Sequence, residues 1–133
     1  LRIAIAIQSL REALKVYTRE THPDLWASTQ LNLANALQHA PSGHVEENLM
    51  ESVSLYEEIL SMRRPTENPV GYARVLANQG NALAHLGVFD HAIPKLTEAR
   101  DIFAQVGEAD SAASINELLD EIGQQRKAAT SER

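Results

Sequence analysis

The sequence predicts an all-α protein, and three observations support this class. Residues 27–39 and 73–85 are near copies, and Ala27 and Ala73 lie 46 positions apart. A fixed repeat of this length is typical of stacked helical units that bury their apolar faces against neighbours. The chain is 44% hydrophobic but only 5% aromatic, a balance that favours helices. No stretch alternates apolar and polar residues between hairpin turns, as strands do.

The first two helices are predicted from apolar spacing and from their ends. A helix over residues 2–18 carries one apolar stripe, spaced by four and three residues. A second helix over residues 23–39 begins at Pro23, because proline suits a first helical position. Residues 40–43 end it. The stripe of the first helix consists of Ile3, Ile7, Leu10, Leu14 and Tyr17.

The next two helices follow the same rules. A third helix over residues 45–63 carries the stripe Leu49, Val53, Tyr56 and Leu60. A fourth helix over residues 69–86 begins at Asn68-Pro69, which repeats the proline start of the second helix. Gly87 supplies the left-handed residue that ends it.

Two further helices complete the predicted domain. The fifth starts near Asp90, a good N-cap residue, and ends at Gly107. Pro94 falls within its first turn or just after, where proline is tolerated. The sixth starts near Asp110 or Ser111, with the stripe Ala112, Ile115, Leu118, Leu119 and Ile122. Short connections predict three antiparallel helix pairs over residues 1–122, followed by a frayed tail over residues 123–133. Because the chain starts with Leu in mid-pattern, we expect a segment of a larger protein.

Composition argues against several classes of function. The net charge is −6 without a basic cluster beyond Arg63-Arg64, so nucleic-acid binding is not expected. No apolar run is long enough to span a membrane. The absence of cysteine removes thiolate chemistry, and we expect a cytoplasmic protein. No nucleophile elbow or phosphate loop occurs, so we expect neither an enzyme nor a cofactor.

Residues 76–83, followed by Gly87, Ala92, Leu96 and Ala99, resemble the tetratricopeptide repeat. The resemblance implies that Gly80, and Ala34 in the earlier copy, occupy the small-residue position where two helices of a repeat touch. The second helices would supply Ala92 and Leu96 in one copy, and Ser52 and Tyr56 in the other. The expected fold is then an α-solenoid, a superhelix of about six antiparallel helices.

The repeat departs from this family's pattern in length and in detail. Its spacing exceeds the usual length of about 34 residues by about 12. Such long units look like those of kinesin light chain and of bacterial multi-repeat signalling proteins. The aromatic residue expected on the first helix is missing from both copies, and so is the proline that ends the second helix.

In a solenoid of this kind the first helix of each pair lines a concave groove. We expect a protein or peptide partner there, because amide side chains can both donate to and accept from a peptide backbone. The chaperone-tail clamp of some relatives is absent, since Leu31 and Ala77 stand where a lysine is needed. The candidate binding residues are Asn32, Asn35, His39, Arg74, Asn78, Asn81 and His85.

Other interpretations compete with the groove hypothesis. The asparagines could bond only to neighbouring helices, and His39 and His85 lack a third ligand for a metal. The segment could instead be structural and form homo-oligomers through the exposed solenoid ends, because the apolar start at residues 1–7 needs covering. It could also be the scaffold part of an enzyme whose catalytic domain lies elsewhere.

Overall fold

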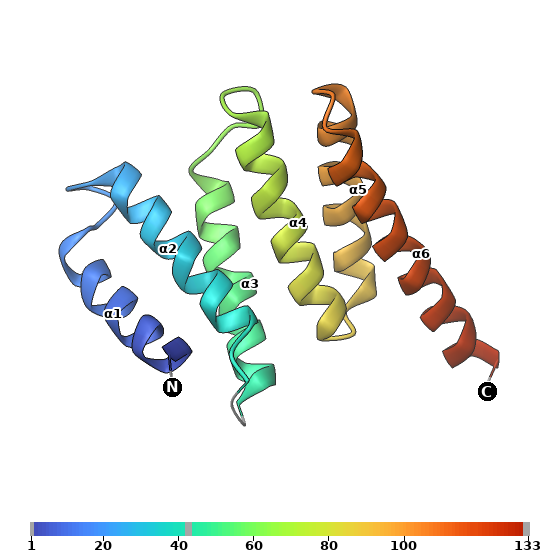
Figure 1. Cartoon of the computed structure of the whole chain (residues 1–133), viewed down its shortest axis with the longest axis horizontal. Coiled ribbons are helices and arrows are strands. Elements are labelled where there is room, and N and C mark those ends of the chain that lie inside the picture. The colour runs from blue at the N-terminus through green and yellow to red at the C-terminus, as the bar shows by residue number, and fades with distance from the viewer. Residues whose placement is uncertain (1, 42–43, 132–133) are drawn as a thin grey trace. The chain divides into compact units, whose positions relative to one another are not determined.

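A computed structural model describes residues 2–41 and 44–131. Within these residues the protein is all-helical and contains no strand, which confirms the predicted class (Figure 1). The helices are α1 Arg2–Val16, α2 Pro23–Gln38, α3 Val45–Ser61, α4 Pro69–His85, α5 Phe89–Gln105 and α6 Ala109–Ser131. The predicted apolar start of the chain lies partly outside the described residues, because Leu1 is not among them.

The chain divides into two compact units, Leu1–Arg63 and Arg64–Arg133. In the first unit α2 packs against both α1 and α3, and in the second α5 packs against both α4 and α6. Successive helices within a unit run in opposite directions, as short connections require (Figure 1).

The two units build their cores differently. In the first unit α2 and α3 supply the buried side chains, among them Leu33, Tyr56 and Ile59, whereas α1 contributes none that is fully buried. The predicted stripe of α1 is only half-buried along its length. In the second unit all three helices reach the core, with residues such as Leu76, Leu96 and Ile115.

Small residues set the closest approach of paired helices, as the repeat resemblance implies. A methyl group at Gly80 would lie 2.6 Å from Leu96 Cγ, so α4 and α5 touch at a point that excludes a side chain. At the equivalent point of the first unit, the buried Ser52 hydroxyl donates to the Ala34 carbonyl oxygen at 2.8 Å. In both units a small residue on the first helix of the pair lets the second helix come close.

Helices α4 and α5 end just before the glycines that were predicted to stop them. Gly87 and Gly107 have φ values of 78° and 82°. In each case the residue after the glycine bonds back to a carbonyl five residues earlier, Val88 N to Leu83 O at 2.9 Å and Glu108 N to Phe103 O at 2.8 Å. This is the Schellman arrangement, which satisfies carbonyl groups that the helix end leaves free.

Two helix ends differ from the prediction. Val88, not Asp90, caps α5, because the turn at Gly87 brings the chain directly into the helix at Phe89. Asp90 lies in the first turn, and its carboxylate lies 3.5 Å from the Arg126 guanidinium.

Helix α6 continues through Ser131. The sequence instead predicts a tail that begins at residue 123. Its last turns contain alanine, glutamine, lysine and arginine, which are all good helix formers. The boundary is corrected accordingly, while fraying of these exposed turns stays a prediction.

Candidate functional site

The exposed polar side chains of α2 are the first candidates for a binding surface. Asn32 and His39 are exposed, whereas Leu33 and Leu37 from the same helix are buried in the core of the first unit. The two polar residues lie seven positions apart, about two helical turns, so they share a face that the packing of α1 and α3 leaves open. This is the arrangement expected for residues that contact a partner.

In the second unit α4 carries Asn78, Asn81 and His85, the counterparts of the first repeat, together with Arg74, whose counterpart is Ser28. Arg74 and His85 are exposed, and Asn78 and Asn81 are half-buried. The buried face of the helix carries Ala73, Val75, Leu76, Gly80 and Leu83, among other residues. Of the three repeated pairs, only His39 and His85 are exposed in both units.

Asn35 bonds to a neighbouring helix, which is the alternative to a binding role given above for the asparagines. The hydroxyl of Tyr56, which is fully buried, lies 2.6 Å from Asn35 Oδ1 and 2.9 Å from Gln38 Oε1. Burial raises the pKa of the Tyr56 phenol above its ordinary value of 10.0, so the ring stays protonated and donates. The half-buried Asn35 amide is therefore turned toward α3.

The second unit cannot repeat this contact. Leu96 occupies the place that corresponds to Tyr56, so Asn81 has no hydroxyl facing it there. The position of Tyr56 on a predicted buried stripe indicates that its hydroxyl needs a hydrogen-bond partner inside the protein. The asparagine and glutamine that serve it lie on another helix, so their choice depends on tertiary packing.

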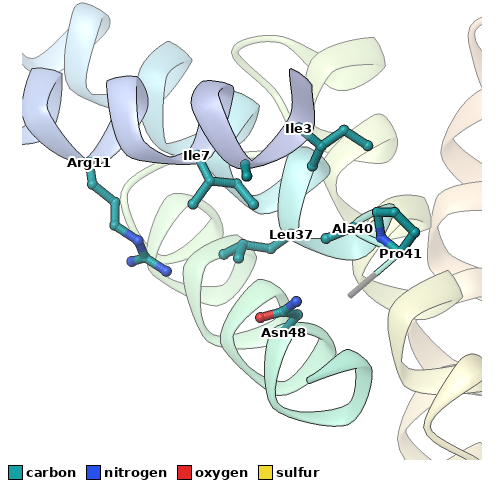
Figure 2. A pocket seen from close by; sticks show the side chains of 8 residues that line it. Ile3, Ile7, Arg11, Leu37, Ala40, Pro41 and Asn48 are labelled. Atoms are coloured by element: carbon teal, nitrogen blue, oxygen red, sulfur yellow. The ribbon is translucent and has the colours of Figure 1, made fainter. Parts of the chain in front are cut away.

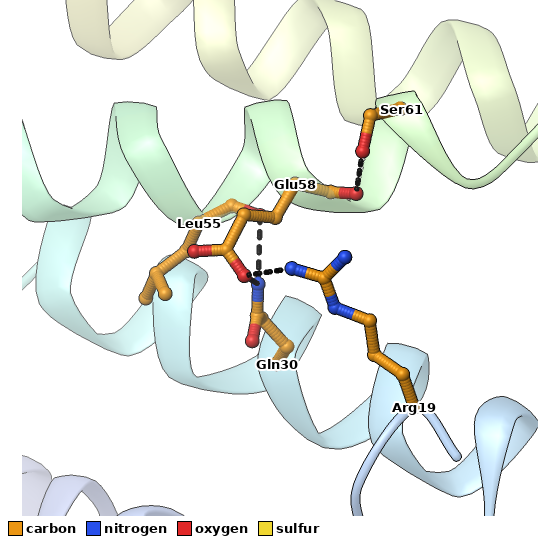
Figure 3. Close-up of polar contacts among 5 residues, drawn as sticks. All are labelled: Arg19, Gln30, Leu55, Glu58 and Ser61. Atoms are coloured by element: carbon orange, nitrogen blue, oxygen red, sulfur yellow. Dashed lines mark hydrogen bonds and ion pairs between the residues drawn. The ribbon is translucent and has the colours of Figure 1, made fainter.

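A polar cluster joins the α1–α2 turn to α3 (Figure 3). Arg19 contacts the Glu58 carboxylate at 3.1 Å and lies over the Trp26 ring, 5.0 Å from its centroid. Gln30 Nε2 donates to the Leu55 carbonyl at 3.1 Å and to Glu58 at 3.2 Å. These contacts fasten the turn and satisfy a buried amide, so we assign the cluster a structural role.

An apolar pocket of about 430 Å³ lies in the first unit (Figure 2). Ile3 and Ile7 project from α1 toward Leu37 and Ala40, and Arg11 and Asn48 add the polar part of its lining. None of the predicted binding residues lines it. The sequence analysis did not anticipate this pocket, because it depends on the distance between α1 and the α2–α3 pair.

The described residues lack two features that other functions would need. No group of three or more histidine, aspartate or glutamate side chains in residues 2–41 and 44–131 is arranged to hold a metal ion. Over the same part of the chain, no helix combines the length and apolarity needed to cross a bilayer.

Comparison with known proteins gives no match among protein-family models, curated proteins or solved structures. The resemblance to the tetratricopeptide repeat therefore stays a resemblance, carried by the residues quoted above.

Proposed function

We propose that this chain is a protein- or peptide-binding module built from helix pairs of the tetratricopeptide type. One observation carries the proposal: α2 and α4 each expose polar side chains away from the apolar residues that they bury. Asn32 on α2, His39 just after the end of α2, and Arg74 and His85 on α4 are exposed, while both helices bury an apolar face. A face that the core does not use and that carries donors and acceptors suits peptide recognition.

The proposal includes stacking of the two helix pairs into a solenoid, so that both faces line one groove. The chain contains no cysteine, so spin labels can be attached to introduced cysteines alone. The test is electron–electron double resonance on the Asn32→Cys/Arg74→Cys variant. A single narrow distance distribution supports a stacked arrangement, and a broad one contradicts it.

Partner contact can be tested by photo-cross-linking. A benzophenone side chain is placed at Asn32 or Arg74 and, as controls, at Ser54 on α3 or Glu98 on α5, which are exposed elsewhere. We expect a cross-linked partner from the first two positions only. Equal cross-linking from the control positions would refute the proposed face.

A second candidate function is self-association through α1. Ile5 and Val16 are 58% and 64% exposed, and their spacing of 11 residues places them on one face of the helix. Exposed apolar side chains aligned in this way favour burial against another surface. Sedimentation equilibrium tests it: a concentration-dependent dimer that Ile5→Glu abolishes supports this function, and a monomer at all concentrations excludes it.

A further inference from the structure

The pocket of the first unit lies where three helix ends meet. Its walls come from the start of α1, the end of α2 and the residues just beyond it, and Asn48 near the start of α3. Most of its lining is apolar, and Leu37 and Ala40 are buried at 2% and 8% exposure. The apolar lining consists of Ile3, Ala4, Ile7, Leu37, Ala40 and Pro41.

The ion pairs of the first unit explain why the space stays open. Arg11 on α1 and Arg19 in the following turn bind Glu51 and Glu58, two turns apart on α3. Both anchors lie beyond the first half of α1. That first half faces the α2–α3 pair with the half-buried Ile3 and Ile7. A gap therefore remains beside these two side chains.

The charges at the edge of the pocket compensate each other. Arg11 donates to both oxygens of Glu51, from Nη1 at 2.7 Å and from Nη2 at 2.9 Å. An anion at this edge must compete with Glu51 for the guanidinium, and a cation must compete with Arg11 for the carboxylate. An uncharged molecule leaves this bidentate Arg11–Glu51 ion pair intact.

We propose that the pocket binds a small, uncharged, apolar molecule. Its volume of about 430 Å³ falls in the range typical of small-molecule sites, roughly 300–1,000 Å³. Such sites are mostly apolar with few polar groups, as this one is. The site is separate from the exposed face of α2, so it goes beyond the proposed partner binding.

The test compares three probes of equal length: 1-octanol, octanoate and octylammonium. Backbone amide shifts of Ile7, Leu37 and Ala40 are followed by NMR during each titration at neutral pH. We expect saturable shifts with 1-octanol and a dissociation constant about tenfold higher for either ion. No saturable shift with 1-octanol, or octanoate binding as tightly as the alcohol, would overturn the proposal.

Matched variants separate pocket binding from general surface adsorption. Ala4→Phe places a ring in the pocket, whereas Ala6→Phe adds the same ring on an exposed residue of α1 outside the lining. We expect only Ala4→Phe to abolish the shifts with 1-octanol, and equal binding in both variants would refute the site. Glu51→Gln leaves Arg11 without its counter-charge, so octanoate should gain about tenfold in affinity over its binding to the wild type. No gain would refute the electrostatic argument.

Discussion

Tyr56 on α3 donates its hydroxyl to Asn35 on α2 across the interior of the first unit, at 2.6 Å. The ring itself is fully buried. The bond links a residue of the repeated polar set to the core, so Asn35 differs in role from Asn32, which is exposed. Substitution of Asn35 would therefore change stability as well as any binding.

Tyr56→Phe should lower the free energy of unfolding by about 1–2 kcal/mol. The change removes the donor and leaves Asn35 Oδ1 and Gln38 Oε1 without their shared partner in a half-buried place. Urea unfolding measures the effect. Tyr17→Phe is the control, because Tyr17 is only half-buried, at the end of α1. Equal stability of the two variants would contradict the structural role of the bond.

Stability should fall as the pH rises above about 10. The pKa of Tyr56 is raised by burial above 10.0, its ordinary value, so the folded state holds the phenol proton more tightly than the unfolded chain. The stabilisation is complete below pH 10 and is lost as the pH climbs toward the folded-state pKa. Urea unfolding between pH 8 and pH 11 measures the decline. Tyr56→Phe should show a shallower decline, and parallel curves would refute this assignment.

Gly80→Ala should destabilise the second unit. The added methyl would lie 2.6 Å and 2.7 Å from two carbons of the buried Leu96. Overpacking lowers the free energy of unfolding by about 1–3 kcal/mol, and the better helix propensity of alanine offsets up to about 1 kcal/mol of this loss. Gly123→Ala is the matched control on α6, where nothing lies within 4 Å of the new methyl. Thermal unfolding should show a loss at Gly80 and a gain at Gly123, and a gain at both would contradict the close approach.

Arg19→Ala should change the environment of Trp26, the single tryptophan of the chain. The guanidinium covers its ring at 5.0 Å, and removal lets water reach the indole. We expect a red shift in tryptophan emission and a stability loss of at most about 1 kcal/mol, because the Arg19–Glu58 pair is exposed. Arg11→Ala removes the other Arg–Glu pair and should leave the emission unchanged. Identical spectra for both variants would contradict this packing.

The helices could be predicted from the sequence because their signals are local. Apolar spacing located all six, and Pro23, Pro69, Gly87 and Gly107 fixed their ends. The predicted N-cap of α5 was wrong. Asp90 suits a capping position by its residue type, but the turn at Gly87 makes the helix begin at Phe89, so Asp90 lies inside its first turn.

The candidate site could be predicted only in part. The repeat located Asn32 and Asn78 on helices, and the structure shows Asn32 as exposed but Asn78 as half-buried. It could not reveal the bond from Tyr56 to Asn35, because the second copy has Leu96 in place of the tyrosine. The pocket beside α1 depends on two Arg–Glu pairs between elements about 40 residues apart, which no local pattern specifies.

The most direct test measures the affinity of a purified cross-linked partner by titration calorimetry. The variants are Asn32→Ala and Arg74→Ala, with Ser54→Ala and Glu98→Ala as exposed controls outside the proposed face. Loss of one peptide hydrogen bond, about 1 kcal/mol, should raise the dissociation constant about fivefold for each of the first two and leave the controls unchanged. Unchanged affinity in Asn32→Ala and Arg74→Ala would contradict the proposal that these faces bind the partner.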